Sequence, residues 1–475
     1  MRVFLLCLLL GTHALMFKAS AAAEFEPDFS GPLSTEIPSD VDNALKNALL
    51  EQGRLQAAHR LFEKHAWQTF IALNWPLNEQ GDLQPEPGAA GAPRWTTWSE
   101  IYEVFKQDGS APDPWGQAQR TLPPLTNIEL PRTEDQSLPY PDIASGAARV
   151  LHNLSSTAAF TILDEVNQAF SNALWDQNGN LVHYEVLINQ EQYDYIVDNQ
   201  LYHVDGQIDY LQQHGRLSFP VGQFGTTQKG AIEIKLAWKQ LDPDADDPSR
   251  YLTQIAYIPS GPEQPRWVPV QMGLVGFHIA QKTAGSPQWI WSTFEHIDNV
   301  EVDMLAHARV KGESVPLRPA FNNPDCAWCA VNVPPQPDAD GTRRTQVMRL
   351  ISVPPATRKL NQQVQQLLAQ ADSKLAYYEL IGVQWPTQPD KPPERGMAFP
   401  GAVVNKSGGE PFPVYLLNSV METYVQTGNQ PADRMPGAVS SRHRTVFATE
   451  SCMGCHAAAP HDDFSWIMIK ARAQR

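Results

Sequence analysis

Two cysteines and a histidine stand close together near the end of the chain, in the pentad Cys452-Met453-Gly454-Cys455-His456. On one turn of a helix, positions i, i+3 and i+4 lie on the same side, so both thiols and the imidazole would face one partner. Two thiols can add to the vinyl groups of a haem while an imidazole binds its iron. The Cys-x-x-Cys-His spacing is the attachment motif of haem c. It predicts one covalently bound haem held by Cys452, Cys455 and His456, with His456 as the metal ligand.

Two other interpretations of the pentad stay open at this point. Its cysteines could form a small disulfide with His456 incidental, or they could share a zinc ion with a second pair, Cys326-Ala327-Trp328-Cys329. Zinc ribbons separate their pairs by about 15–20 residues, and an oxidising compartment favours disulfides over thiolates. Ala330 follows the second pair where haem attachment needs a histidine. Cys326 and Cys329 are therefore expected to form a local disulfide, with a redox-active disulfide as the alternative.

The first 23 residues have the layout of a secretory signal peptide. Arg2 gives a basic start, an apolar run follows, and small residues from Ala19 to Ala23 supply a cleavage site. The sequence therefore predicts export, with the bacterial periplasm as the location. Past this segment no stretch reaches the roughly 20 apolar residues of a membrane helix, so no membrane span is expected in the mature chain.

The chain is acidic, with 475 residues and a formal net charge of −16. Removal of residues 1–23 takes away Arg2 and Lys18 and no acidic residue, which moves the charge to −18. An acidic surface argues against nucleic acid and anionic lipid as partners, and it favours basic redox partners or cationic substrates. The length of the mature chain predicts two or three domains.

The pattern of apolar residues predicts an α+β fold, with a central antiparallel β-rich region, a helical N-terminal region and a helical C-terminal return that carries the haem motif. After the signal peptide we expect a helical and proline-rich region over 24–145, a β-rich middle over 146–345, and a helical return with the haem-attachment tail over 346–475. Helices are predicted over 39–52, 55–71, 98–105, 147–174, 357–376 and 414–425. Strands are predicted over 181–188, 231–238, 251–258, 268–280, 288–297 and 378–383.

The far side of the predicted haem must be built by residues upstream of the pentad, or stay open. The tail after the pentad offers His461 and Met468, and both are too close to the covalent anchor to reach the opposite haem face. An open position favours chemistry on a small ligand, whereas a filled one favours electron transfer.

One upstream hairpin could supply that side. A turn at Thr283-Ala284-Gly285-Ser286 would pair Lys282 with Pro287, and by the same register His278 with Trp291. One sheet face would then carry Gly276, His278, Ala280, Trp289 and Trp291. These residues form either a wall for the haem or ordinary core. The sixth iron ligand is then His278, His296, His443 or none.

The pentad resembles the attachment motif of c-type cytochromes. With the following Asp462-Asp463-Phe464-Ser465-Trp466, it also resembles the tails of β-sheet monohaem cytochromes that handle hydroxylamine or nitric oxide. Some of those proteins carry a lysine cross-linked to haem, and Lys229, Lys235 and Lys239 lie in strand-like sequence here. The whole chain is similar to large bacterial cytochrome c family proteins of unassigned role that have a single C-terminal Cys-x-x-Cys-His.

These observations lead us to expect a periplasmic monohaem c-type cytochrome that performs redox chemistry on a small ligand of the peroxide or nitrogen oxide class. Such a protein would meet a redox partner protein or a small-molecule oxidant or reductant. Two alternatives stay open, so enzyme activity itself is undecided. One is an electron-transfer subunit that docks a partner oxidoreductase, and the other is a binding module in which the haem is structural.

Overall fold

The computed structural model describes residues 33–118, 149–150, 173–260, 266–303, 305–392, 408–426, 451–457 and 463–474. The predicted signal peptide, most of the helix predicted over 147–174, His443 and His461 lie outside these residues. Within the described part of the chain, no helix combines the length and the apolar character that crossing a membrane requires.

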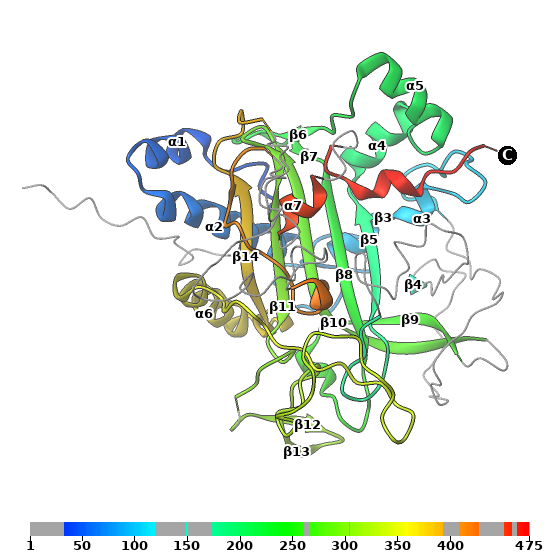
Figure 1. Cartoon of the computed structure of the whole chain (residues 1–475), viewed down its shortest axis with the longest axis vertical. Helices are drawn as coiled ribbons and strands as arrows, with labels where there is room; N and C mark the ends of the chain where they lie inside the picture. The colour runs from blue at the N-terminus through cyan, green and yellow to red at the C-terminus, as the bar shows by residue number, and fades with distance from the viewer. Residues whose placement is uncertain are drawn as a thin grey trace, which may run out of the picture.

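A large, mainly antiparallel sheet forms the centre of the molecule (Figure 1). Its main path runs β15 (Pro411–Phe412), β14 (Tyr378–Pro386), β11 (Ser286–His296), β10 (Arg266–Thr283), β8 (Ile232–Gln240), β5 (His183–Ile188) and β3 (Ser99–Glu100). Neighbours along this path are antiparallel. Further strands join at its sides: β9 (Thr253–Ser260), β4 (Arg149–Val150), β6 (Val221–Gly222) and β7 (Lys229–Gly230). The predicted α+β class with an antiparallel centre is confirmed.

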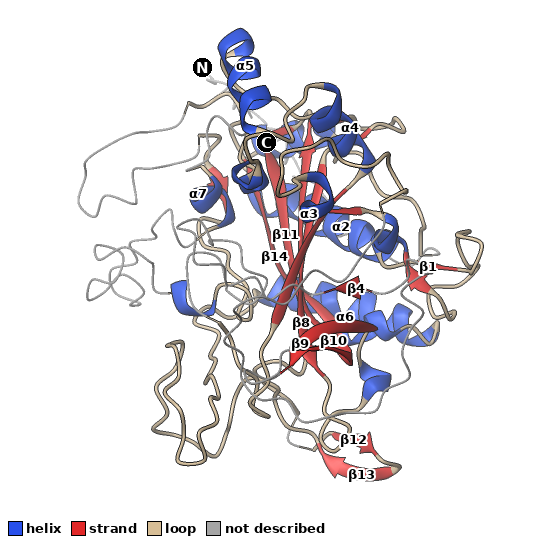
Figure 2. Cartoon of the chain, turned by 90° about the vertical axis from the view of Figure 1, so that its right-hand side faces the viewer, coloured by secondary structure: helices blue, strands red, loops and turns tan. Residues whose placement is uncertain are grey.

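Helices from the N-terminal and C-terminal parts of the chain cover one face of this sheet. These are α1 (Asn43–Glu51), α2 (Leu55–Leu73) and α6 (Pro355–Gln370), and Figure 2 shows α2 and α6 on the side of the sheet opposite to α7. The ring of Phe70 stacks on Phe294 with centroids 4.1 Å apart, and Phe62 stacks on Trp385 at the same distance. The largest apolar cluster takes residues from all three segments predicted for the mature chain, so these segments share one core.

The other face is covered by pieces of chain that are far apart in the sequence. They include α3 (Ile101–Val104), α4 (Gln190–Asp198), α5 (Val204–His214), the 408–426 segment, α7 (Cys452–His456) and the 3-10 turn η9 (Trp466–Lys470). A second apolar cluster joins α4 and η9 to α7 and to β10 and β11. The smaller elements are β1 (Pro76–Leu77), β2 (Ala92–Pro93), η1 (Arg94–Thr97), η3 (Pro248–Arg250), β12 (His307–Val310), β13 (Glu313–Pro316), η4 (Lys374–Tyr377) and η6 (Thr423–Val425).

The helix predicted over 414–425 is wrong, because this segment runs irregularly along β11 and ends in the short turn η6. Asn418 donates from Nδ2 to Thr293 Oγ1 at 2.8 Å and to the carbonyl oxygen of Phe294 at 3.0 Å. The backbone N–H of Ser419 donates to Glu295 Oε1 at 2.6 Å. Short polar side chains that bond locally or to a neighbour compete with the helical backbone, and here the sheet supplies the stronger partners.

Candidate functional site

The pentad forms one helical turn, α7, and its second residue, Met453, fixes its position on the sheet. Ser451 caps the turn, since its Oγ accepts from the N–H of Gly454 at 3.1 Å. Met453 is fully buried, and its N–H donates to Gln384 Oε1 on β14 at 2.7 Å. With Met453 fixed below, Cys452 and Cys455 remain partly exposed.

The two cysteine pairs share the same spacing but differ in state. Cys326 and Cys329 form a disulfide, whereas both thiols of the pentad are free. Burial raises the pKa of Cys452 and raises that of Cys455 to about 12, so both are protonated at neutral pH. The disulfide leaves Cys326 and Cys329 without thiolates for a zinc ion shared with the pentad. In the described residues, no group of three or more His, Cys, Asp or Glu side chains is arranged to hold a metal ion.

His456 is held in one tautomer by the backbone. Its Nδ1 lies 2.7 Å from the carbonyl oxygen of Phe464. A carbonyl can only accept, so Nδ1 carries the proton and Nε2 keeps its lone pair. Burial lowers the pKa of His456 to about 4, which keeps the ring neutral at pH 7. The ring also lies against Trp291, with centroids 4.2 Å apart. This is the form in which an imidazole ligates a metal through Nε2.

The position of the Phe464 carbonyl is itself fixed by a tight turn. Asp463 and Phe464 have backbone φ angles of 54° and 68°, in the left-handed region that residues with a side chain seldom adopt. Lys282 forms an ion pair with the Asp463 carboxylate, and Trp289 Nε1 donates to the Asp463 carbonyl oxygen at 2.9 Å. Two side chains from the β10–β11 hairpin therefore hold the turn that presents an acceptor to His456.

A row of accessible side chains crosses the centre of the sheet on the same face. Val186 on β5 pairs with Lys235 on β8, and Lys235 pairs with His278 on β10. In β5 and β8, both described in full, Val186 and Lys235 are the only side chains that are not buried. In the described stretch from Met272 to Thr283, His278 is likewise the only residue that is not buried. The row therefore marks a place where this face is incompletely covered.

Polar groups on this row and Glu422 beside it act on the pentad. His278 Nε2 lies 2.9 Å from Glu422 Oε1, and Glu422 Oε2 accepts from the N–H of Asn418 at 2.9 Å. The charges of Glu422 and Lys235 affect the pKa of Cys455, and those of His278, Lys235 and Glu422 affect that of His456. Burial would raise the pKa of Glu422, but His278 and Lys235 hold it below the ordinary value, so the carboxylate is ionised. The row and the pentad therefore lie near one another.

Only one of the three lysines singled out in the sequence lies at this site. Lys235 is near Cys455, as its effect on that thiol shows. Lys229 instead donates to the carbonyl oxygen of Ile37 at 2.9 Å. Lys239 donates to both carboxylate oxygens of Asp246 at 2.6 Å.

The predicted hairpin has the right faces and a shifted register. His278 pairs with Thr293, and Trp291 pairs with Ala280. The pairing moves by two residues because of a bulge between Gln281 and Thr283. A shift of two leaves every side chain on its original face. The predicted grouping of His278, Ala280 and Trp291 on one face is therefore confirmed.

The structure separates the candidate ligands from one another. His278 faces the pentad, whereas both ring nitrogens of His296 are already used. Its Nδ1 accepts from the N–H of Asp298 at 3.1 Å, so Nε2 carries the proton and donates to the carbonyl oxygen of Arg250 at 3.0 Å. The ring stacks on Tyr251 at 4.1 Å. His296 is therefore an incorrect candidate for the sixth ligand.

A cavity of about 550 Å³ lies elsewhere in the described residues, and no pentad residue lines it. Four of its charged side chains compensate one another in pairs. Lys239 binds Asp246 at 2.6 Å, and Arg250 donates to Asp298 at 2.7 and 2.8 Å.

Sequence reasoning missed Glu422, Phe464 and Gln384. Glu422 was placed inside a predicted helix, and its partner His278 is 144 positions away. Phe464 contributes only a backbone carbonyl, which any residue could supply. No signal in the sequence marks these contacts, because each depends on how distant segments meet.

Comparison with known proteins finds no family model that matches the chain and no curated protein or solved structure similar to it. Its function is therefore inferred from the geometry of this site.

Proposed function

We propose that the chain is a periplasmic monohaem c-type cytochrome, in which Cys452 and Cys455 would attach the haem and His456 would bind its iron. The observation that carries the proposal is the state of the pentad. Two free thiols and a neutral imidazole with an unprotonated Nε2 lie on one helical turn beside an incompletely covered sheet face. A structural disulfide would need neither the fixed tautomer nor the accessible row. These residues fit a covalently attached haem.

We further propose redox chemistry on a small ligand of the peroxide or nitrogen oxide class. When bound, the haem iron supplies a reversible one-electron change and a coordination position for such a ligand. The ionised Glu422 can only accept, so the proton between it and His278 resides on His278 Nε2. While this bond holds, Nε2 has no lone pair for iron. His278 is thereby suited to hold or donate a proton, and Lys235 offers a cationic donor beside it.

The attachment is tested by producing the full chain in cells that mature c-type cytochromes. Covalent haem is measured by haem staining after denaturing electrophoresis and by mass spectrometry. The parent should carry one haem, and the double variant Cys452→Ser/Cys455→Ser should carry none. The matched control is Cys326→Ser/Cys329→Ser, which alters the same spacing elsewhere and should keep the haem. A haem-free parent, or a haem that survives the loss of both pentad thiols, would overturn the proposal.

The chemistry is tested by absorption spectra of the ferric and ferrous protein with and without carbon monoxide. A ferrous spectrum that changes with carbon monoxide supports an open iron position. A six-coordinate spectrum that ignores carbon monoxide counts against ligand chemistry and favours the electron-transfer function. The two experiments fail separately, because attachment does not depend on an open position.

A further inference from the structure

The Cys326–Cys329 disulfide lies on the surface, in contrast to the pentad. Cys329 is exposed and Cys326 is half-buried. Between them Trp328 is 85% exposed, the highest fraction for any large apolar side chain in the described residues. A thiolate from another molecule can therefore approach the sulfur of Cys329 without any opening of the fold. Accessible disulfides of this kind are the ones that take part in exchange.

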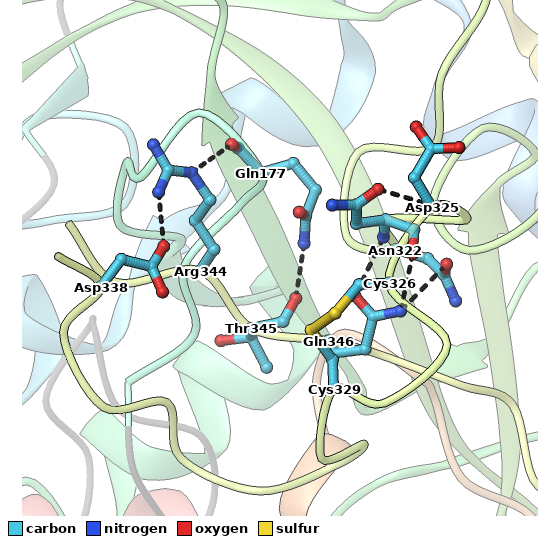
Figure 3. Close-up of a disulfide and its surroundings, with 10 residues drawn as sticks. Gln177, Asn322, Asp325, Cys326, Cys329, Asp338, Arg344, Thr345 and Gln346 are labelled. Atoms are coloured by element: carbon cyan, nitrogen blue, oxygen red, sulfur yellow. Dashed lines mark hydrogen bonds and ion pairs between the residues drawn. A yellow bond between two sulfur atoms is a disulfide. The ribbon is translucent and has the colours of Figure 1, made fainter. Parts of the chain in front are cut away.

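The loop that carries the disulfide is closed by other bonds. On the side that enters the loop, Gln346 accepts from the N–H of Asn323 at 2.9 Å and donates to the Asn322 side chain at 3.2 Å (Figure 3). On the side that leaves it, Asn332 exchanges two hydrogen bonds of 2.9 Å with the backbone of Met348. Both ends of the loop are thus tied to the same neighbouring segment, 346–348.

This arrangement makes the disulfide dispensable for the position of the loop. A bridge between residues three positions apart removes little chain entropy from the unfolded state. The hydrogen bonds made by the side-chain amides of Gln346 and Asn332 do not depend on the disulfide. The loop therefore keeps its shape after reduction, and the two thiols stay adjacent. Once an oxidised disulfide has formed a mixed disulfide with one of these thiols, the adjacent thiol displaces it readily, because that step is intramolecular.

We propose that Cys326 and Cys329 form a reversible thiol–disulfide exchange site for a protein dithiol, with Trp328 as the contact that the partner meets. A partner thiolate attacks Sγ of Cys329 and forms a mixed disulfide, while Cys326 leaves as a thiolate and takes up a proton. The second partner thiol then attacks the mixed disulfide and releases Cys329. The pair gains two electrons and two protons, and the partner becomes a disulfide. This site is independent of the haem proposal.

Trp328 supports a protein partner over a small thiol. A solvated tryptophan carries a large apolar area that a folded monomer gains nothing by displaying, and tryptophan is prominent among residues that dominate protein contacts. Its neighbour Ala327 is also exposed, while the exposed Asp325, which is paired with Arg318, precedes Cys326, so the apolar contact beside the sulfurs is bordered by charged groups. A protein that presents its dithiol on a flat face can cover Trp328 and reach Cys329 together.

The test uses the native full chain with reduced thioredoxin as the dithiol probe and glutathione at equal thiol concentration as the monothiol. Reduced cysteines are alkylated and located by peptide mass spectrometry, which separates them from Cys452 and Cys455. Thioredoxin should reduce the Cys326–Cys329 pair at least tenfold faster than glutathione, with unchanged far-ultraviolet circular dichroism. When the reductant is replaced by oxidised glutathione, the pair should re-form its disulfide and release two molecules of reduced glutathione.

Two variants make this test specific. Trp328→Ser should slow reduction by thioredoxin several-fold and leave reduction by dithiothreitol unchanged. Cys326→Ser/Cys329→Ser should keep the circular dichroism spectrum and the unfolding midpoint close to those of the parent. A bond that is reduced only after unfolding in urea, or a Trp328→Ser protein reduced by thioredoxin as fast as the parent, would overturn the proposal.

Discussion

The Nδ1 atom of His456 lies 2.7 Å from the carbonyl oxygen of Phe464, eight residues further along the chain. This contact fixes which nitrogen of the ring carries the proton. It exists because Asp463 and Phe464 adopt left-handed backbone angles, which a hairpin on the sheet holds in place. Backbone strain of this kind costs about 1–3 kcal/mol per residue and persists where the surroundings impose it. The site thus joins a local turn to the central sheet.

Loss of the ion pair between Lys282 and Asp463 should loosen this turn. In Lys282→Met, the carbonyl of Phe464 should hold His456 less firmly, which would give the iron of the proposed haem a less electron-rich ligand. We expect a higher reduction potential and a lower iron–histidine stretching frequency in the resonance Raman spectrum, with covalent haem retained. Lys282→Arg keeps the charge and should restore both values toward those of the parent. Unchanged potential and frequency in Lys282→Met would show that the pair does not position His456.

If the proposed haem is bound, removal of the proton held by His278 should weaken the binding of anions to its ferric form. His278→Ala deletes a donor, so the dissociation constant for azide should rise about tenfold, equivalent to about 1.4 kcal/mol. Glu422→Gln removes a negative charge beside the same space and should lower that constant. The measurement is a spectral titration with azide, and His307→Ala, on an exposed histidine of β12, is the control. Identical titrations for all variants would place the ligand elsewhere.

Glu233 should make stability depend on pH. Burial raises its pKa to about 7, while it accepts from Gln192 at 2.6 Å and from Ser465. The folded state then binds a proton between about pH 4.5 and 7 that the unfolded state does not, so this contribution to stability declines as pH rises. Glu233→Gln mimics the protonated form. The difference in the free energy of unfolding, variant minus parent, should therefore increase by up to about 3 kcal/mol as the pH rises from 4.5 to 8.

The comparison between parent and variant isolates Glu233 from other buried groups. Burial lowers the pKa of His59, His183 and His296 to about 4, so they increase stability as pH rises and act in the opposite direction. They are the same in both proteins and cancel in the difference. Urea unfolding across this pH range is the measurement, and curves that stay parallel would contradict the assignment.

Removal of the buried charge of Lys239 should lower the stability of the protein much more than removal of an exposed charge. Its side chain is 2% exposed and lies 2.6 Å from Asp246 and 3.8 Å from Asp176, which is also buried. Burial alone would lower the pKa of Lys239, but these carboxylates outweigh it and raise the pKa. Lys239→Met leaves two acidic groups without a cation and should lower the free energy of unfolding by about 3–5 kcal/mol.

The matched control for Lys239 is Lys311→Met, which breaks an ion pair with Asp244 in which both side chains are about two-thirds exposed. Solvent already screens that pair, so its loss should leave the unfolding midpoint nearly unchanged. Urea unfolding of both variants at pH 7 compares them. Equal effects would show that burial does not set the cost.

Local patterns were enough to predict most of the sheet and the two helices that begin the described chain. Clean alternation of apolar and polar residues predicted β8, and strand-like sequence predicted β5, β9, β10, β11 and β14, since successive side chains of a strand point to opposite faces. The grouping of His278 with Trp291 was predicted for the same reason, since a face depends only on whether positions are odd or even. The register was not, because a bulge is invisible to such a pattern.

Contacts over long separations could not be predicted from the sequence. The helix predicted over 414–425 failed because Asn418 and Ser419 find their partners on β11, about 125 positions earlier. The role of Glu422 depends on the same docking. A helical period was present in this segment, but a single chain gives no information about which strand will lie beside it.

The dock of α7 on β11 and β14 also has a consequence for the order of folding. The N–H of Met453 forms a hydrogen bond with Gln384, 69 positions earlier, and the ring of His456 contacts Trp291. A ribosome therefore completes every strand that α7 touches before the pentad is made. Contacts of such long range close slowly. Until α7 packs on the sheet, the two thiols consequently lack the burial that raises their pKa values in the folded protein, and they are more acidic then than afterwards.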